Sequence, residues 1–306
     1  MISKSVAAII LPATFLSVSH ASAKDVALAP ASKWHVHYGA YSCIAARSFG
    51  EGESAVTLRL EQIAPGHYYD VSFFGKPVGA SERLLNSRND PSRTRRLAEM
   101  RIGDGNPFDR AFYSGETKDG IPSLSFGTMT YIASLQTAGP IVDGKVGSYG
   151  TYAPAYYLSG TLDTISLRIG SSDRQILMTG PLEPVLAKLT HCGEAFVTSW
   201  GFDIEERRSL KTGPVIENVT AFTDAIEYPP ELLRQGGRGI VTLRLSVEAD
   251  GSPSDCHAYD ITEPAGFSET LCAKALETLT FKPATDTDGN AVRAYYIQRI
   301  NFTIPS

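Results

Sequence analysis

The sequence predicts an α+β protein: a mainly β N-terminal domain with one closing helix, followed by a smaller domain in which one helix packs on a three-stranded antiparallel sheet. Three observations predict this class. Segments in which apolar and polar residues alternate with period two, as half-buried strands require, occur in both halves of the 306-residue chain. Two other segments show the i, i+3, i+4 spacing of an amphipathic helix. The chain is also long enough for about two domains.

The first 23 residues have the pattern of a secretory signal peptide. A short basic segment (1–4) precedes a mostly apolar one (5–19), and Ala21-Ser22-Ala23 fits a small-x-small cleavage site. The apolar stretch of about 14 residues is shorter than the roughly 20 that span a bilayer. We therefore expect cleavage after residue 23 and an exported product. Retention of the segment as a membrane anchor is the alternative, and the intact mass of the exported protein distinguishes the two.

Composition and charge exclude several classes of protein. An apolar fraction of 42% and a charged fraction of 20% are those of a folded chain. The net charge of −5 provides no basic field for nucleic acid, so we expect no nucleic-acid partner.

The four cysteines, Cys43, Cys192, Cys256 and Cys272, are expected to be bridged, because exported proteins meet an oxidising environment. Four cysteines allow three pairings. If the two halves of the chain fold separately, Cys43–Cys192 and Cys256–Cys272 is the economical pairing. No Cys-x-x-Cys motif indicates a redox or zinc site.

Residues 24–202 are predicted to form the mainly β domain. Alternating segments predict strands at 56–61, 69–73 and 164–169. Residues 81–157 show no regular pattern, and the arginines there are typical of a solvated helix or loop. The tyrosines between 149 and 157 fit either a binding surface or ordinary β turns.

A helix is predicted to close this domain. Apolar positions from Leu182 to Ser199 follow helical spacing, and Pro181 suits a helix start. Cys192 lies within it. The polar residues 203–218 after it are predicted to be a linker.

An enzyme housed in the N-terminal domain is a less favoured hypothesis. His35 and His37 would lie on one side of a strand, with His67 and His191 as further candidate ligands. None of the G-x-S-x-G, Walker, H-E-x-x-H or G-x-G-x-x-G motifs occurs. We therefore expect no catalytic residue, no cofactor and no metal. Stoichiometric zinc in the mature protein would revive the hypothesis.

The sequence patterns after residue 219 indicate secondary structure more clearly than those before it. Tyr228-Pro229-Pro230 precedes a helical turn that Gly236-Gly237 ends. Residues 241–249 then alternate without a fault, which predicts a strand with one apolar face and one solvated face. Asp250-Gly251 turns the chain into a second strand over 254–261.

The chain then forms a helix and a last strand. Apolar residues between Phe267 and Leu279 lie on one helical face, and Phe281-Lys282-Pro283 ends the helix. In the last strand, up to Ile304, apolar residues again alternate with polar ones.

This ordered set of features resembles the TonB C-terminal domain over about residues 219–306. The family's opening, strand, turn, helix-end motif and terminal strand are represented by Tyr228-Pro229, Gly239-Ile240-Val241, Val247, Asp250-Gly251, Phe281-Lys282-Pro283 and the strand up to Ile304. The chain departs from the family pattern at Leu279-Thr280, where an aromatic residue is common, and in the turn at 262–266. Cys256 and Cys272 are additional.

The resemblance implies that the last strand binds partners by β-strand addition, in which a peptide pairs with an exposed sheet edge. The residues that it places at this site are Tyr295, Ile297, Arg299, Asn301 and Thr303. The implied partners are peptide segments of outer-membrane transporters or other envelope proteins. An edge already paired within the protein, or in a homodimer through the last strand, is the alternative.

Energy transducers of the TonB family also need a retained inner-membrane helix and a long proline-rich spacer. In this chain a predicted cleavable segment occurs where the family has the membrane helix, and a predicted β-rich domain occurs where the family has the spacer. We therefore expect a periplasmic binding protein linked to outer-membrane transport. A membrane-anchored transducer, on the periplasmic side of the inner membrane, is the alternative if the N-terminal segment is retained.

Overall fold

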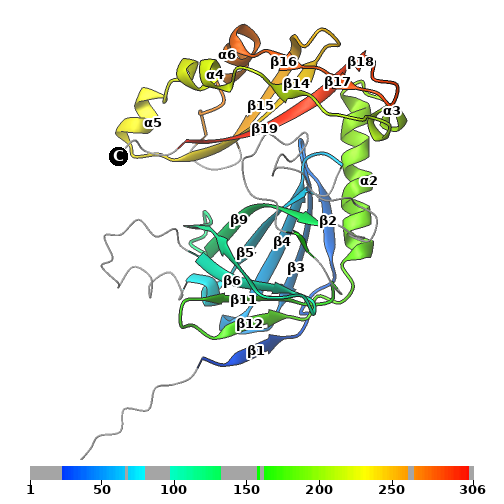
Figure 1. The fold of residues 1–306 in the computed structure, drawn as a ribbon. Coiled ribbons are helices and arrows are strands. Elements are labelled where there is room, and N and C mark those ends of the chain that lie inside the picture. The colour runs from blue at the N-terminus through cyan, green and yellow to red at the C-terminus, as the bar shows by residue number, and fades with distance from the viewer. Residues whose placement is uncertain are drawn as a thin grey trace, which may run out of the picture.

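The computed structural model describes residues 23–65, 68–79, 97–131, 157–158, 162–260 and 265–302. The predicted signal segment, except for its last residue, lies outside these residues, as do most of the tyrosines between 149 and 157. The described chain combines several sheets with a few helices, which confirms the predicted α+β class (Figure 1).

Two sheets form the N-terminal half, which we define as residues 23–202. The first contains, in spatial order, β1 (Asp25–Leu28), β12 (Arg174–Leu177), β11 (Ile165–Ile169), β6 (Leu97–Ile102) and β7 (Phe108–Ala111). The second contains β10 (Tyr157–Leu158), β9 (Pro122–Tyr131), β5 (Tyr68–Phe74), β4 (Val56–Gln62), β3 (Cys43–Phe49) and β2 (His35–Tyr38), with β8 (Tyr113–Glu116) also on β9. A short 3-10 helix, Gly52–Ser54, precedes β4.

One apolar core joins the two sheets. Leu58 and Phe73 from the second sheet share a buried cluster with Met100 and Leu167 from the first. Both sheets therefore bury one face against the other, which is the stable solution for strands that are apolar on one side.

The region predicted to be irregular, 81–157, contains four of these strands. β6, β7, β8 and β9 all lie within it, so the prediction of a solvated helix or loop is wrong for this part. In β9 a glycine interrupts the alternation: Gly127 adopts a φ of +61°, a left-handed conformation that breaks a regular strand. The arginines between Arg83 and Arg96 lie outside the described residues.

Helix α2 (Glu183–Ser199) closes this half, as predicted, and runs up one side of the molecule to the C-terminal sheet (Figure 1). Its Cys192 is bonded to Cys43 at the start of β3, with an S–S distance of 1.99 Å. Gly193 lets the helix approach the β4–β5 turn, because a Cβ at this position would lie 3.0 Å from the backbone nitrogen of Pro65. This glycine, which weakens the helix as a sequence pattern, thus lies in a tight contact between the helix and that turn.

The segment predicted to be a linker has structure of its own. It contains α3 (Ile204–Arg208), which begins after the N-capping side chain of Asp203, and β13 (Val215–Ile216). β13 pairs with β16 (Phe281–Lys282) of the C-terminal part. The linker is therefore held along the C-terminal part.

The C-terminal part contains a three-stranded antiparallel sheet in the order β15–β14–β19. These strands span Pro253–Asp260, Gly239–Val247 and Ala294–Phe302, respectively. The remaining elements are α4 (Val219–Ala225), α5 (Pro230–Arg234), α6 (Leu271–Thr278), β17 (Ala284–Thr285) and β18 (Ala291–Val292). Helix α6 packs on the apolar face of the sheet, where Leu271 and Ala275 are buried with Leu243 and Leu245.

Candidate functional site

The tyrosine, proline and glycines at the start of the C-terminal part build one aromatic cluster. The ring of Tyr228 packs edge-on against Phe267 and Phe302, with centroids 5.6 Å apart in both pairs. Its hydroxyl donates a hydrogen bond to the carbonyl of Gly237. A Cβ at Gly239 would lie 2.2 Å from the ring of Phe267, so only glycine leaves room for that ring. These motif residues therefore fix the first and last strands against each other.

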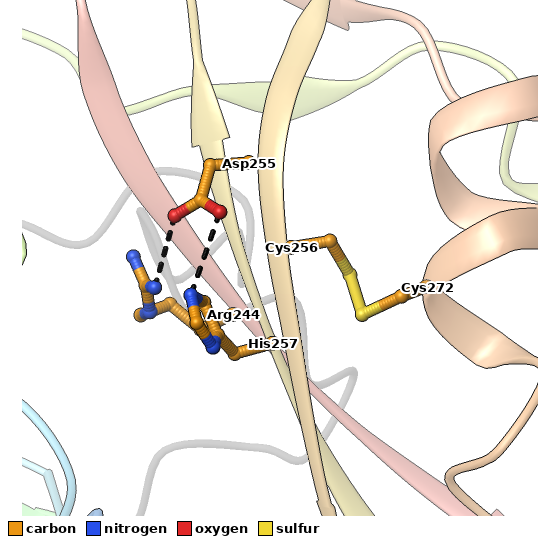
Figure 2. Close-up of a disulfide and its surroundings, with 5 residues drawn as sticks. All are labelled: Arg244, Asp255, Cys256, His257 and Cys272. Atoms are coloured by element: carbon orange, nitrogen blue, oxygen red, sulfur yellow. Dashed lines mark hydrogen bonds and ion pairs between the residues drawn. A yellow bond between two sulfur atoms is a disulfide. The ribbon is translucent and has the colours of Figure 1, made fainter.

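The second disulfide joins the sheet to its helix (Figure 2). Cys256 on β15 is bonded to Cys272 on α6, with 5.5 Å between their Cα atoms. Both predicted bridges are thus present, which confirms the pairing expected if the two halves fold separately.

β19, the predicted partner-binding strand, lies at one end of the sheet. Among the described residues it pairs with β14 along its whole length, from Ala294 opposite Val247 to Phe302 opposite Gly239. β15 forms the other end and also pairs with β14. The edge strands of a sheet carry backbone N–H and C=O groups with which a further strand can pair, so these two edges are the candidate sites for strand addition.

The second face of this sheet is buried, contrary to the prediction that it is solvated. Thr242, Arg244 and Ser246 on β14 point away from α6, and their exposed fractions are only 1%, 2% and 0%. The alternation of the sequence correctly separates two faces by polarity. The N-terminal half covers the polar one, and alternation carries no information about that.

Two of the predicted partner-binding side chains lie in this buried contact. Tyr295 packs edge-on against Trp200 at the end of α2 and against Phe202, with centroids 5.4 Å and 5.5 Å away. The guanidinium of Arg207 in α3 lies 4.3 Å from the same ring centroid, within the range of a cation–π contact. Ile297 shares the cluster and is 2% exposed.

The other predicted residues occupy three different environments. Arg299 forms an ion pair with Asp70 of β5, and both side chains are largely buried. Asn301 is exposed. Thr303 lies outside the described residues. The C-terminal half of β19, from Gln298 to Asn301, is thus its more accessible part.

Arg244 is a residue that sequence reasoning missed. It lies in the middle of the buried face, where its guanidinium lies 4.8 Å from the ring centroid of Trp200. The same guanidinium donates a hydrogen bond to Asp255 at 3.0 Å (Figure 2). Asp255 also faces His257 at 3.4 Å. On the β15 side of the same face, Tyr259 stacks on Tyr41 with centroids 4.7 Å apart. An arginine in the middle of a faultless alternation gave no sign that it would be buried.

The described histidines among those considered as metal ligands do not form a cluster. His35 and His37 are exposed on β2, the His191 side chain is 81% exposed on α2, and His67 lies outside the described residues. In the part of the chain that the structure describes, no three histidine, cysteine or acidic side chains are close enough to hold a metal ion. Within the same residues, no helix has both the length and the apolar character needed to cross a bilayer.

The comparisons with known proteins agree with the geometry of the C-terminal part. Residues 224–304 match the family described as Gram-negative bacterial TonB protein C-terminal. No curated protein matches the chain. Domains of this family are transport-related and interact with envelope proteins such as outer-membrane transporters. Residues 224–304 are therefore a TonB C-terminal domain, carried behind a β-rich N-terminal half.

Proposed function

We propose that this chain is a periplasmic TonB-family protein that binds peptide segments of outer-membrane transporters, or of other envelope proteins, by β-strand addition on β19. The observation that carries the proposal is the position of β19 at the end of the sheet within a TonB C-terminal domain. An extended peptide beside this strand would extend the sheet to four strands. Backbone hydrogen bonds would then provide much of the affinity.

The accessible part of the strand limits where a partner is recognised. Tyr295 and Ile297 are buried against the N-terminal half, so their side chains are not available to a peptide in this arrangement. Asn301 is exposed, and Gln298 and Ile300 are half-buried. We infer that a partner pairs with the backbone edge over 298–301, where the side chain of Asn301 is exposed. Tyr295 and Ile297 hold the strand against the N-terminal half.

Export is part of the proposal and has two supports. The first 23 residues have the pattern of a signal peptide. Both disulfides fit an oxidising compartment such as the periplasm. With the segment removed, residues 24–202 would form the N-terminal domain, 203–218 the connecting segment and 219–306 the TonB domain.

Proline substitutions in β19 test the binding site in the full mature chain. Successive residues of a strand direct their N–H groups to opposite edges of that strand. Ile300→Pro and Asn301→Pro therefore form a pair: one variant removes a donor from the outer edge, and the other removes a donor from the ladder to β14. The probe is a fluorescent peptide with the sequence of a TonB box, the short segment of an outer-membrane transporter that TonB domains bind. The outer-edge variant is expected to bind this peptide at least about 10-fold more weakly, while its melting temperature changes little. Fluorescence anisotropy and thermal unfolding measure the two effects.

The other edge of the sheet provides the matched control. His257→Pro and Ala258→Pro make the same pair of changes on β15. Loss of peptide binding in this pair alone would move the site to β15. Absence of binding at millimolar peptide to the unmodified chain would contradict the proposal, and a dimer whose dissociation restores binding would show that a second copy occupies β19.

A further inference from the structure

The contact between the N-terminal half and the TonB domain is mixed in character. Its buried apolar cluster contains Ile63, Ala64, Val197, Tyr295 and Ile297. Among the described residues, two arginines over aromatic rings, the Tyr41–Tyr259 stack, a hydrogen bond from the Tyr41 hydroxyl to the Asp260 carbonyl and the Arg299–Asp70 ion pair also join the two parts. Contacts of this kind between domains resemble transient protein interfaces and allow the domains to move apart unless they are large and apolar.

The ion pair joins the predicted partner-binding strand to an acidic position in the N-terminal half. Arg299 of β19 pairs with Asp70 of β5, and their side chains are only 14% and 12% exposed. Asp70 stands directly opposite Glu61 of β4 in the ladder, and like charges in such a position repel. Glu61 has its own partners, Arg59 at 2.9 Å and the hydroxyl of Ser42 at 2.5 Å. Arg299 is therefore a cation that the TonB domain contributes to a pair of neighbouring carboxylates.

A glycine with conformational freedom lies beside this contact. Gly201 follows the last turn of α2 with a φ of +80°, and no atom lies within 4 Å of the position of its missing Cβ. The pairing of β13 with β16 holds the later part of the linker to the TonB domain. Arg208 of α3 is also ion-paired with Glu194 of α2, so rotation about Gly201 requires this pair to open. Motion of the TonB domain against α2 would then be concentrated between Trp200 and α3.

We propose that Asp70 and Arg299 form a reversible clasp that docks the TonB domain on the N-terminal half. In the docked arrangement the side chains of Tyr295, Ile297 and Arg299 are withheld from a partner, and the strand edge is what remains available to it. When the clasp opens, the whole polar face of β14 and β19 becomes accessible, including Arg244. The docking of the two parts does not depend on the proposed function. The consequence for partners rests on the proposed function.

Charge reversal tests the clasp in the full mature chain. Arg299→Asp places a third carboxylate beside Asp70 and Glu61, and Asp70→Arg places two arginines together. Each variant is expected to increase the radius of gyration in small-angle scattering and to raise acrylamide quenching of Trp200 at least about threefold, because like charges in a buried contact cost several kcal/mol. The quenching is measured in a Trp34→Phe background, so that Trp200 is the reporting residue. The double variant, Asp70→Arg with Arg299→Asp, is expected to restore both values.

Controls separate the clasp from general damage. Arg234→Asp reverses an exposed arginine paired with Glu231 in the same domain and is expected to leave scattering and quenching unchanged. Compact scattering and unchanged quenching in both single variants would overturn the proposal, as would a double variant that stays open. If Arg299→Asp does not fold, as judged by circular dichroism, Arg299→Gln replaces it in the same measurements.

The peptide assay distinguishes this inference from the proposed function. If the open variants bind no peptide and the unmodified chain binds none either, the proposed function fails and the clasp stands. If the unmodified chain binds peptide and the charge variants neither open nor change in affinity, the clasp fails and the proposed function stands. Altered affinity that returns to normal in the double variant supports both.

Discussion

Replacing Cys43 and Cys192 together by alanine is expected to lower the free energy of unfolding of the N-terminal half by about 4–5 kcal/mol. The bond closes a loop with a sequence separation of 149 residues, and the chain-entropy model assigns most stabilisation to the longest loops. Both residues are buried, so the cavity left by the sulfur atoms adds to the loss. Urea unfolding followed by far-UV circular dichroism measures the effect.

The second bridge is the control for loop length. Cys256 and Cys272 are separated by 16 residues, for which the same model gives about 3 kcal/mol. Alanine at both of these positions is expected to destabilise the TonB domain by that smaller amount and to leave the unfolding of the N-terminal half unchanged. Equal losses from the two double variants would contradict the loop-length explanation.

Gly251→Ala is expected to destabilise the TonB domain by about 3 kcal/mol or more, because two penalties combine at this position. The residue has a φ of +87°, where an L side chain is strained. An added Cβ would also lie 2.0 Å from the carbonyl oxygen of Phe281, whose N–H donates to the Gly251 carbonyl at 3.0 Å. The hairpin turn and the start of β16 cannot separate without losing that hydrogen bond. Thermal unfolding measures the change.

Gly289 provides a matched control for the backbone penalty alone. It also follows an aspartate in a turn and has a φ of +88°, but no atom lies within 4 Å of the position of an added Cβ. Gly289→Ala is therefore expected to cost about 1 kcal/mol. A loss from Gly251→Ala no larger than this would show that β16 moves aside easily. In the first turn, Asp250, which precedes Gly251, accepts hydrogen bonds from the Ser252 hydroxyl and amide. These bonds lower the pKa of Asp250, so the carboxylate stays ionised.

Local sequence patterns predicted those strands and helices that bury one side, because burial of one side imposes a period on the sequence. The alternation of residues 241–249, the Asp-Gly turn and the spacing of α2 each record one buried side of a strand or helix, and all three elements are present. The cysteine pairing followed from the distribution along the chain only on the condition that the two halves fold separately. The motif around Tyr228 identified the domain, and its rings and glycines pack where the motif requires.

The candidate site could be predicted less well, because its environment is built by residues distant in sequence. Asp70 and Arg299 are separated by 229 positions, and nothing around either one indicates the other. Arg244 is polar and buried, a combination that alternation interprets as solvated. The pairing of β13 with β16 was missed for a related reason: a two-residue strand is too short to show a period.

The Cys43–Cys192 bond also determines how the chain would respond to a mechanical pull. Tension applied along α2 reaches Cys192 and passes through the disulfide directly to Cys43 at the start of β3. The intervening residues are locked in a covalent loop and contribute no extension even after their strands unravel. At about 3.4 Å per extended residue, some 500 Å of contour length is withheld. A chain stretched between its two ends would therefore lengthen in single-molecule force measurements by this much more after reduction of the bond.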